Sequence, residues 1–247
     1  MDSEATRHYD IERILEEELK LSLVDGRLPC AKALKICRKL MISPEKISAM
    51  ANKLNLKISN AMKEDITKYL NISEEKVIVI HNGIDTNKWN YKPIHDGLKK
   101  RYNLRDDYIL FVGRPTPQKG MEYLIEAADD IEAQVVMAAV GADTPQYENE
   151  IRERIQTKRN LLWINELLKE EEYIQLYSSA KAFVCPSLYE PFGIVNLEAM
   201  ACRTPVVATA VGGIKEIVIP DETGFLIDPQ NSQQIADNVN KLLKENP

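Results

Sequence analysis

Residues 182–213 read AFVCPSLYEPFGIVNLEAMACRTPVVATAVGG, and this stretch decides the fold class. It begins with a short apolar run, continues through a loop into an amphipathic pattern with helical spacing, and ends with a second β-branched apolar run. A strand, a helix and a second strand in that order form a βαβ unit, in which the two strands are parallel. Because both runs are apolar throughout, we expect a parallel sheet covered by helices on both faces.

The same alternation extends from residue 76 to the end of the chain. The other apolar runs are KVIVIH (76–81), DYILFVG (107–113), QVVMAAVG (134–141) and LLWI (161–164). Helical patterns lie among them in MEYLIEAADD, YENEIRERIQ, EEYIQLYSSA and SQQIADNVNKLL. We therefore predict a doubly wound, Rossmann-like α/β domain over residues 76–247, in which ligands bind beyond the carboxyl ends of the strands.

The first part of the chain has a different pattern. Residues 1–57 show helical spacing of apolar side chains, and Ser43-Pro44-Glu45 is typical of a helix start. We predict a small helical domain there that resembles a helix-turn-helix, and a bridging helix and loop over residues 58–75. A helical hairpin that packs on another surface is the alternative.

Composition excludes several classes of protein. The net charge of the 247 residues is -6, which gives no bulk attraction to nucleic acid or to an anionic membrane. The first twenty residues are charged and no apolar run reaches spanning length, so we expect a cytoplasmic protein without a signal peptide or membrane contact.

The cysteines do not suggest a metal or redox site. Cys30, Cys37, Cys185 and Cys202 form no C-x-x-C pair, and no histidine cluster accompanies them. We expect buried thiols in a reducing compartment, with no metal and no cofactor.

The loop after the run at 107–113 brings two cations to a strand-to-helix turn. In FVGRPTPQKGMEYLIEA, Arg114 and Lys119 lie between the end of the strand at Gly113 and a helix that begins near Gly120. Backbone amides and the helix dipole favour an anion there, and both side chains bind phosphate oxygens well. The sequence is consistent with a diphosphate site, or with an ordinary solvated loop that carries two surface cations.

The loop after the run at 182–185 brings carboxylates to a helix start. Glu190 lies just outside the helix and Glu198 about one turn inside it, while Gly193, Ile194 and Val195 form its first turn. One carboxylate could reach a ribose and the other a hexose, with a phosphate at the helix start. The alternatives are a dipole partner for Glu190 and a solvated position for Glu198.

Two further motifs are weak in isolation. Gly212-Gly213 follows a predicted strand and would let the backbone approach a ligand closely. Asn82-Gly83, in IHNGID, predicts a tight turn.

Together these motifs resemble a known family. HNGID, GRPTPQKG, EPFGIVNLE and PVVATAVGG occur in this order, and the two glutamates are eight positions apart. This is similar to the carboxyl-terminal donor domain of the family 4 retaining glycosyltransferases, which have the two-domain GT-B fold. The sequence from WINELLKEEE to EAMAC most resembles the glycogen or α-glucan synthase branch. The similarity runs from about residue 58 to the end.

The resemblance implies a role for each site residue. Arg114 and Lys119 would neutralise the diphosphate of an ADP- or UDP-sugar such as ADP-glucose or UDP-glucose. Glu190 would contact the transferred sugar or lie close to the reacting face. The family needs no metal and stabilises the departing nucleotide electrostatically.

The remaining residues would bind the rest of the donor. By the same resemblance, Glu198 would bind the ribose, Gly193, Ile194 and Val195 would offer amides to the sugar or phosphate, and the backbone near Ile164 would meet the base.

The chain also departs from the family. About 57 residues precede the similarity and are predicted to be helical, so we expect no counterpart of the acceptor-domain residues among them. Orienting a saccharide acceptor needs both walls of the cleft, and we expect nucleotide-sugar binding with little or no transfer by this chain alone.

Alternatives from other classes stay open. One is a regulatory protein whose helix-turn-helix segment binds DNA while the α/β domain senses a nucleotide sugar, although little positive charge is concentrated there. Another is a structural α/β unit that dimerises and has a vestigial site. A partner chain that supplies the missing domain also stays open.

Overall fold

The computed structural model describes residues 59–70, 73–77 and 79–245. They belong to two compact units, which divide between Asn82 and Gly83. The predicted helical domain of residues 1–57, with Cys30 and Cys37, lies outside the described residues.

The first unit contains one described α-helix, α4 (Asn60–Leu70), and the 3-10 helix Glu74–Lys76. Ser59 begins α4, because its Oγ accepts a hydrogen bond from the Met62 backbone N at 3.0 Å. The prediction that the run KVIVIH is a strand is wrong for its described residues, which contain none. A strand needs a neighbouring strand to satisfy its backbone, and the described residues before Gly83 include no strand.

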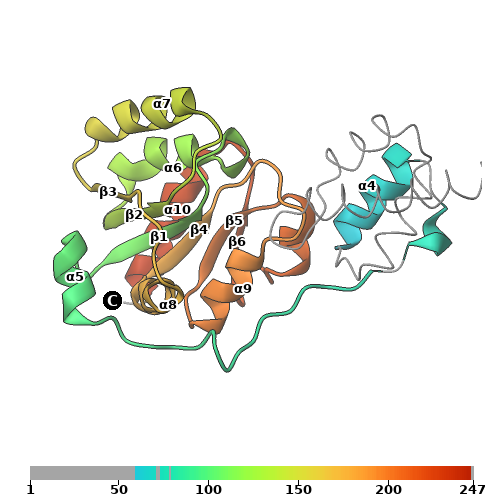
Figure 1. Ribbon diagram of the computed structural model, residues 1–247, viewed down its shortest axis with the longest axis horizontal. Helices are drawn as coiled ribbons and strands as arrows, with labels where there is room; N and C mark the ends of the chain where they lie inside the picture. Colours follow the sequence, from blue (N-terminus) through green and yellow to red (C-terminus); the bar gives the residue numbers. More distant parts are fainter. Residues whose placement is uncertain (1–58, 71–72, 78, 246–247) are drawn as a thin grey trace, which may run out of the picture. The chain divides into compact units, whose positions relative to one another are not determined.

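The second unit is built on a six-stranded parallel sheet with the order β3-β2-β1-β4-β5-β6 (Figure 1). The strands are β1 (Tyr108–Gly113), β2 (Gln134–Ala139), β3 (Leu161–Ile164), β4 (Ala182–Cys185), β5 (Val206–Thr209) and β6 (Gly224–Ile227). The order reverses between β1 and β4, as in a doubly wound Rossmann-like domain. The predicted fold class is therefore confirmed.

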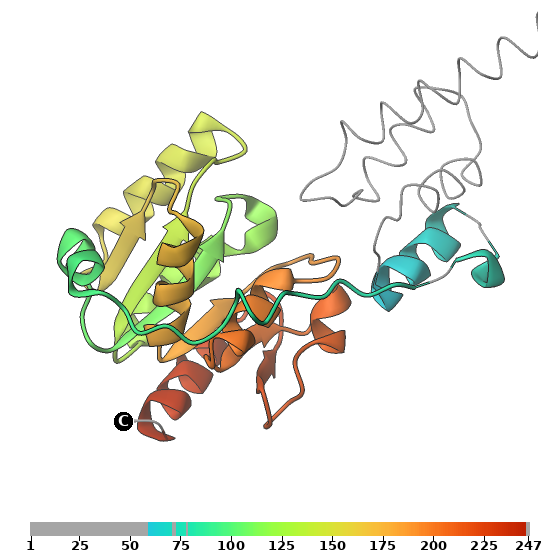
Figure 2. The same cartoon turned by 60° about the horizontal axis from the view of Figure 1, so that its bottom comes forward.

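Helices cover both faces of this sheet (Figure 2). They are α5 (Asp96–Tyr102), α6 (Met121–Ala127), α7 (Pro145–Gln156), α8 (Glu170–Ser179), α9 (Ile194–Ala201) and α10 (Ser232–Glu245). Four 3-10 helices, at Glu74–Lys76 in the first unit and at Pro117–Lys119, Ala128–Asp130 and Gly212–Glu216 here, complete the described helical segments. Local signals start several of them; Thr144, for example, accepts the Tyr147 N–H at 3.1 Å and is followed by Pro145.

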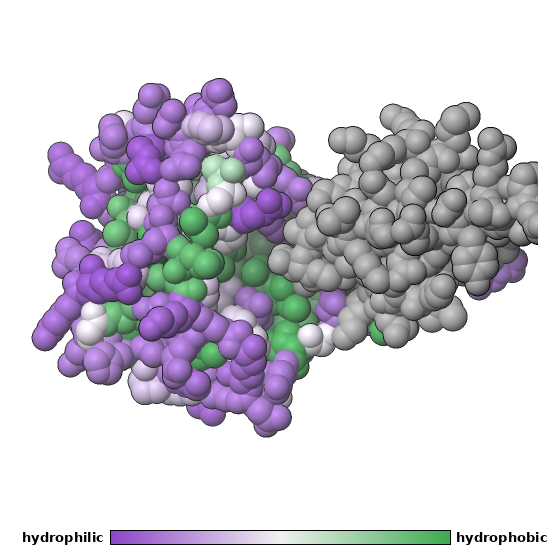
Figure 3. All heavy atoms as spheres, viewed as in Figure 1, coloured by the Kyte–Doolittle hydropathy of each residue, from purple (hydrophilic) through white to green (hydrophobic). Residues whose placement is uncertain are grey.

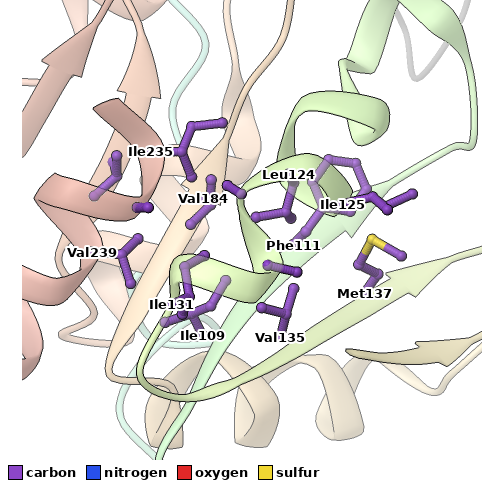
Figure 4. Close-up of a cluster of buried hydrophobic side chains, with 14 of the residues drawn as sticks. Ile109, Phe111, Leu124, Ile125, Ile131, Val135, Met137, Val184, Ile235 and Val239 are labelled. Atoms are coloured by element: carbon purple, nitrogen blue, oxygen red, sulfur yellow. The ribbon is translucent and has the colours of Figure 1, made fainter. Parts of the chain in front are cut away.

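Alternate residues of each strand divide between two cores. In β1, Ile109 and Phe111 face α6 and α10, and Figure 4 shows these side chains packed with Leu124 and Val239. Their neighbours Tyr108 and Leu110 face the opposite core, which includes residues of α5, α8 and α9. This explains why the strands are apolar throughout: side chains on both faces are buried.

Three local features differ from the sequence expectations or were not predicted. β6 was missed because it begins with a glycine, which disfavours strands. Helix α5 was also not predicted. The expected turn at Asn82-Gly83 is wrong: the turn lies at residues 86–88, where the Asp85 carboxylate accepts the Asn87 N–H at 2.9 Å.

The polarity of the surface and the burial of two thiols agree with the expectations from composition. Figure 3 shows polar and charged side chains around smaller apolar areas on one face of the second unit. Cys185 and Cys202 are free and buried, and burial raises the pKa of both thiols.

Candidate functional site

The site begins where the strand order reverses. β1 and β4 are parallel neighbours, with Ile109 opposite Ala182, so their carboxyl ends lie side by side. The next strand in sequence after β1 lies on one side of it, and the strand after β4 lies on the other side of β4. The loops that leave β1 and β4 therefore separate and leave room for a ligand between them.

These two loops are joined by hydrogen bonds. The Leu188 N–H donates to the Gln118 carbonyl at 2.8 Å, and Gln118 Nε2 donates to the Tyr189 carbonyl at 2.9 Å. Gly120 has a φ of 65°, and a Cβ there would lie 2.1 Å from the Pro186 carbonyl oxygen. Only glycine can lie this close to the Pro186 carbonyl, and Gly120 is also the residue that precedes α6.

The joined loops bring Lys119 and Glu190 together across 71 positions of sequence. Lys119 Nζ lies 2.5 Å from Glu190 Oε2. The Glu190 side chain is 5% exposed and that of Lys119 25%. A buried carboxylate is costly unless it is paired, so Lys119 stabilises its charge. The sequence analysis placed Lys119 and Glu190 at two separate loops; the structure brings these two side chains into direct contact.

A third loop, after β5, holds the backbone of Glu190. The Gly213 N–H donates to the Glu190 carbonyl at 3.0 Å. A Cβ on Gly212 would lie 2.1 Å from that same carbonyl oxygen. The glycine pair was expected to let backbone approach a ligand; in the structure it approaches the loop that carries Glu190. The pair thus supports the site indirectly.

Helix α9 begins beside Glu190 without a capping side chain. Gly193 has a φ of 90°, and a Cβ there would lie 3.1 Å from Glu190 Cγ. Ile194 and Val195 are the first two helical residues, where no preceding helical turn can accept from the backbone amides, and the Asn196 N–H donates to the Gly193 carbonyl at 3.0 Å. The side chain of Asn196 is fully buried and donates to the Gly193 carbonyl at 3.1 Å, while its Oδ1 has no hydrogen-bond partner among the described residues. The helix start is suited to an anion.

Glu198 lies farther along α9. Its Oε2 accepts a hydrogen bond from the hydroxyl of Tyr177, on α8, at 3.2 Å. Tyr177 was not identified from the sequence, because its spacing from Ile174 is that of an ordinary core position. Only the packing of α8 beside α9 reveals the contact.

Arg114 has a different ion-pair partner from Lys119. It lies on the same loop, but its ion pair is with Asp143, on the loop after β2, with Nη1 3.6 Å from Oδ1. The two side chains are 58% and 50% exposed. A pair as exposed as this is weak, and the guanidinium has a long, rotatable stem.

Ile164 ends the edge strand β3, with β2 between it and β1. Its side chain is buried in the core that includes α5 and α8. The residue after it, Asn165, donates to Glu148 Oε1 at 2.9 Å. Ile164 thus lies two strands away from the strand-order reversal.

Two further properties concern metals and membranes. Within residues 59–70, 73–77 and 79–245, no group of three or more His, Cys, Asp or Glu side chains is placed to hold a metal ion. No helix in the same part of the chain combines the length and apolarity that a membrane span needs.

The strand order, the loop-held glutamate and the open start of α9 define a Rossmann-like domain with a charged site at its point of strand reversal. Residues 98–247 match the family described as Glycosyl transferases group 1. The chain therefore belongs to this family of GT-B glycosyltransferases.

Individual relatives agree with that assignment. The chain is 37% identical to the alpha-maltose-1-phosphate synthase of Mycolicibacterium smegmatis over 207 residues, which is 76% of this chain and 53% of that protein. It is 38% identical to an uncharacterized glycosyltransferase of Methanocaldococcus jannaschii over 200 residues, 76% of this chain and 50% of the other. The chain thus spans about half the length of these curated relatives.

Solved structures are similar as well. A sucrose-phosphate synthase from Thermosynechococcus elongatus has a TM-score of 0.66 and 29% identity, covering 81% of this chain and 53% of that one. Anabaena HepE in complex with UDP-glucose has a TM-score of 0.68 and 25% identity, covering 83% of this chain and 59% of that one.

Proposed function

We propose that residues 83–247 bind a nucleotide sugar and form the donor domain of a retaining hexosyltransferase of the family 4 type, close to the glycogen or α-glucan synthases. The donor is an ADP- or UDP-hexose, such as ADP-glucose or UDP-glucose. The observation that carries the proposal is the Lys119–Glu190 pair, which lies at the reversal of strand order beside the open start of α9.

The diphosphate is assigned to Lys119 and Arg114. An ammonium has three N–H donors, so Lys119 can keep Glu190 and also bind a phosphate oxygen. Arg114 has to leave Asp143, and an exposed pair of this kind costs about 1 kcal/mol or less to break. The guanidinium then offers a planar pair of donors to phosphate.

The rest of the donor is assigned to groups around α9. Glu190 lies closest to the transferred hexose, and the amides of Gly193, Ile194 and Val195 bind its hydroxyls or the phosphate. Glu198, about one turn into the helix, accepts hydrogen bonds from the ribose hydroxyls. The backbone near Ile164 contacts the base.

The chemistry assigned to the site is departure of the nucleotide. The bond between the anomeric carbon and the diphosphate oxygen breaks, and the negative charge that develops on that oxygen is stabilised by Lys119 and Arg114 without a metal. The acceptor hydroxyl attacks the same face of the sugar, and its proton passes to the departing diphosphate, so that configuration is retained.

The names and contents of the relatives support this donor class. Two of them are named for maltose-1-phosphate and sucrose-phosphate synthesis, and the HepE structure contains UDP-glucose. A saccharide is the acceptor class that we propose for the complete enzyme, with the cytoplasm as its location.

Transfer needs a second wall of the cleft. Because the chain spans about half of its curated relatives, we expect the 247 residues alone to bind donor with little or no transfer. Elongation of an α-glucan by the purified chain would contradict this part of the proposal.

Calorimetric titration with UDP, ADP and their glucose esters tests the proposal directly. We expect saturable binding of at least one of these ligands without added metal. Absence of binding to all four would contradict the proposed function and favour a structural role for the α/β unit.

Single substitutions then locate the diphosphate. Lys119→Ala and Arg114→Ala should each weaken binding of the preferred nucleoside diphosphate by about 1.5–3 kcal/mol, because each removes a charged hydrogen bond. Lys181→Ala is a matched control, since Lys181 is 27% exposed, pairs with Asp107 at the opposite ends of β4 and β1, and should leave the dissociation constant unchanged. An unchanged dissociation constant in both site variants would show that the diphosphate binds elsewhere.

The roles of Glu190 and Glu198 can be distinguished by comparing ligands with and without the hexose. Glu198→Gln should weaken binding of nucleoside diphosphates with or without a sugar, because the ribose is present in both. Glu190→Gln should weaken binding only when the hexose is attached. The reverse pattern would exchange the two assignments.

A further inference from the structure

We propose that Tyr177 is a positioning residue that holds the Glu198 carboxylate in place for the ribose. The inference rests on the proposed function, because it concerns the same donor site. It assigns a role in ligand selectivity to a fully buried side chain that touches no ligand in the proposed arrangement.

The geometry gives Tyr177 one defined direction. Its hydroxyl lies 3.2 Å from Glu198 Oε2, and the residue is 0% exposed. The ring packs against Phe183 of β4, with ring centres 5.3 Å apart, and against Trp89, edge to face at 6.0 Å. With contacts from β4 and from the segment that precedes α5, the ring cannot turn its hydroxyl away from α9.

The backbone of Tyr177 is held as well. Its carbonyl accepts a hydrogen bond from Thr204 Oγ1 at 2.5 Å, which ties α8 to the segment that follows α9. The phenol and the carboxylate are therefore positioned by the same pair of helices. A shift of one helix against the other would change the 3.2 Å contact directly.

The protonation state of the phenol suits a permanent donor. Burial raises the pKa of Tyr177 well above 10, and the negative charge of Glu198 raises it further. The hydroxyl thus keeps its proton at all physiological pH values and donates to the carboxylate. A glutamate side chain has large rotational freedom, and holding it before the ligand arrives removes that ordering cost from binding.

Tyr108 offers a matched control. It is also fully buried, and its hydroxyl donates to the carbonyl of Leu176, one residue from Tyr177, at 2.7 Å. Loss of the Tyr108 hydroxyl removes a buried hydrogen bond from the same helix without touching Glu198. A purely structural effect should therefore be the same in Tyr108→Phe and Tyr177→Phe.

The test measures recognition of the ribose. The full 247-residue chain is titrated with whichever of ADP and UDP binds more tightly, and with its 2′,3′-dideoxy analogue. We expect Tyr177→Phe to weaken the ribonucleotide about tenfold, as loss of a charge-assisted hydrogen bond would, and the dideoxy analogue by less than about twofold. Tyr108→Phe should preserve the wild-type ratio of the two dissociation constants.

Two further variants complete the experiment. In a Glu198→Ala background, Tyr177→Phe should have no additional effect on the ratio, because its target is gone. If Tyr177→Phe does not fold, Trp89→Leu is used instead. Trp89 is half-buried and packs against the Tyr177 ring, so its replacement should also weaken binding of the ribonucleotide more than binding of the dideoxy analogue. Failure of the wild-type chain to bind any nucleotide would overturn the proposed function together with this inference. Normal wild-type binding with an unchanged ratio in Tyr177→Phe, or in Trp89→Leu if that variant is used, would overturn the inference alone.

Discussion

At the amino ends of the strands, polar side chains hydrogen-bond the backbone and the acidic member of each charged pair is largely exposed, whereas at the carboxyl ends of β1 and β4 a buried carboxylate is paired with a lysine. Before β3, Asn160 Nδ2 donates to the carbonyls of Ala128 at 2.7 Å and Ala133 at 3.0 Å. After β1 and β4, the buried Glu190 is paired with Lys119 beside the uncapped start of α9.

This difference separates stability from binding capacity. Neutral hydrogen bonds to backbone complete their partners and leave little for a ligand. A partly exposed ammonium and a helix start retain donors that an anion can use. Substitutions at the amino ends should therefore change stability alone, while those in the loops after β1 and β4 should change binding, with or without stability.

The largest effect is expected at Gly120. In Gly120→Ala the new methyl group would lie 2.1 Å from the Pro186 carbonyl, at a φ of 65°. We expect a loss of about 3 kcal/mol in the free energy of unfolding, together with weaker nucleotide binding, because the two site loops must separate. Chemical denaturation and calorimetry measure the two effects.

Gly141→Ala is the control for backbone strain alone. Gly141 has a φ of 77°, but a Cβ there meets nothing within 4 Å. The expected cost is about 1–2 kcal/mol, with unchanged nucleotide affinity. Equal losses in the two variants would show that the contact with Pro186 is unimportant.

A smaller loss of stability is expected for Lys119→Ala. The variant leaves the Glu190 carboxylate, 5% exposed, without its cation, and should lower the free energy of unfolding by about 2 kcal/mol. The double variant Lys119→Ala, Glu190→Gln should recover part of that stability, because no buried charge remains. Additive losses in the double variant would contradict the pairing.

At the amino ends, Asn160→Ala should cost about 1–2 kcal/mol, because buried carbonyls lose their donor. Nucleotide affinity should stay at the wild-type value. Asn165→Ala, after β3, is the comparison for stability. The hydrogen bond described above joins its side chain to that of Glu148 and not to a backbone carbonyl, and its loss should cost less. A large change in nucleotide affinity in Asn160→Ala would contradict the conclusion that substitutions at the amino ends of the strands affect stability alone.

The smallest effect concerns Asp106, also before β1. A hydrogen bond from Lys99, 2.5 Å away, lowers the pKa of this carboxyl below 3.8. A lowered pKa in the folded state stabilises the protein above pH 3.8, and this contribution is lost as the pH falls through the lowered value. Asp106→Asn should therefore reduce the melting temperature slightly at pH 7 and not at all at a pH below the lowered pKa of Asp106. An equal reduction at both pH values would show that the charge is not responsible.

Local patterns in the sequence were sufficient for most of the fold. The apolar runs at β1 to β5 and the helical spacing at α6 to α10 reflect burial on both faces of a sheet. Such burial produces a pattern of apolar residues that can be recognised within a few positions of the sequence. β6 was missed and KVIVIH was wrongly predicted as a strand. In both cases the deciding factor is whether a neighbouring strand is available, which a short run does not encode.

The site shows the same division. Composition and motif spacing placed Lys119, Glu190, Gly193 and Glu198 at the loops and helix start where the structure has them. The sequence did not determine that Lys119 would pair with Glu190, that Arg114 would lie against Asp143, or that Tyr177 would hold Glu198. Strand order and helix packing choose these partners, because they bring together side chains that local sequence leaves far apart.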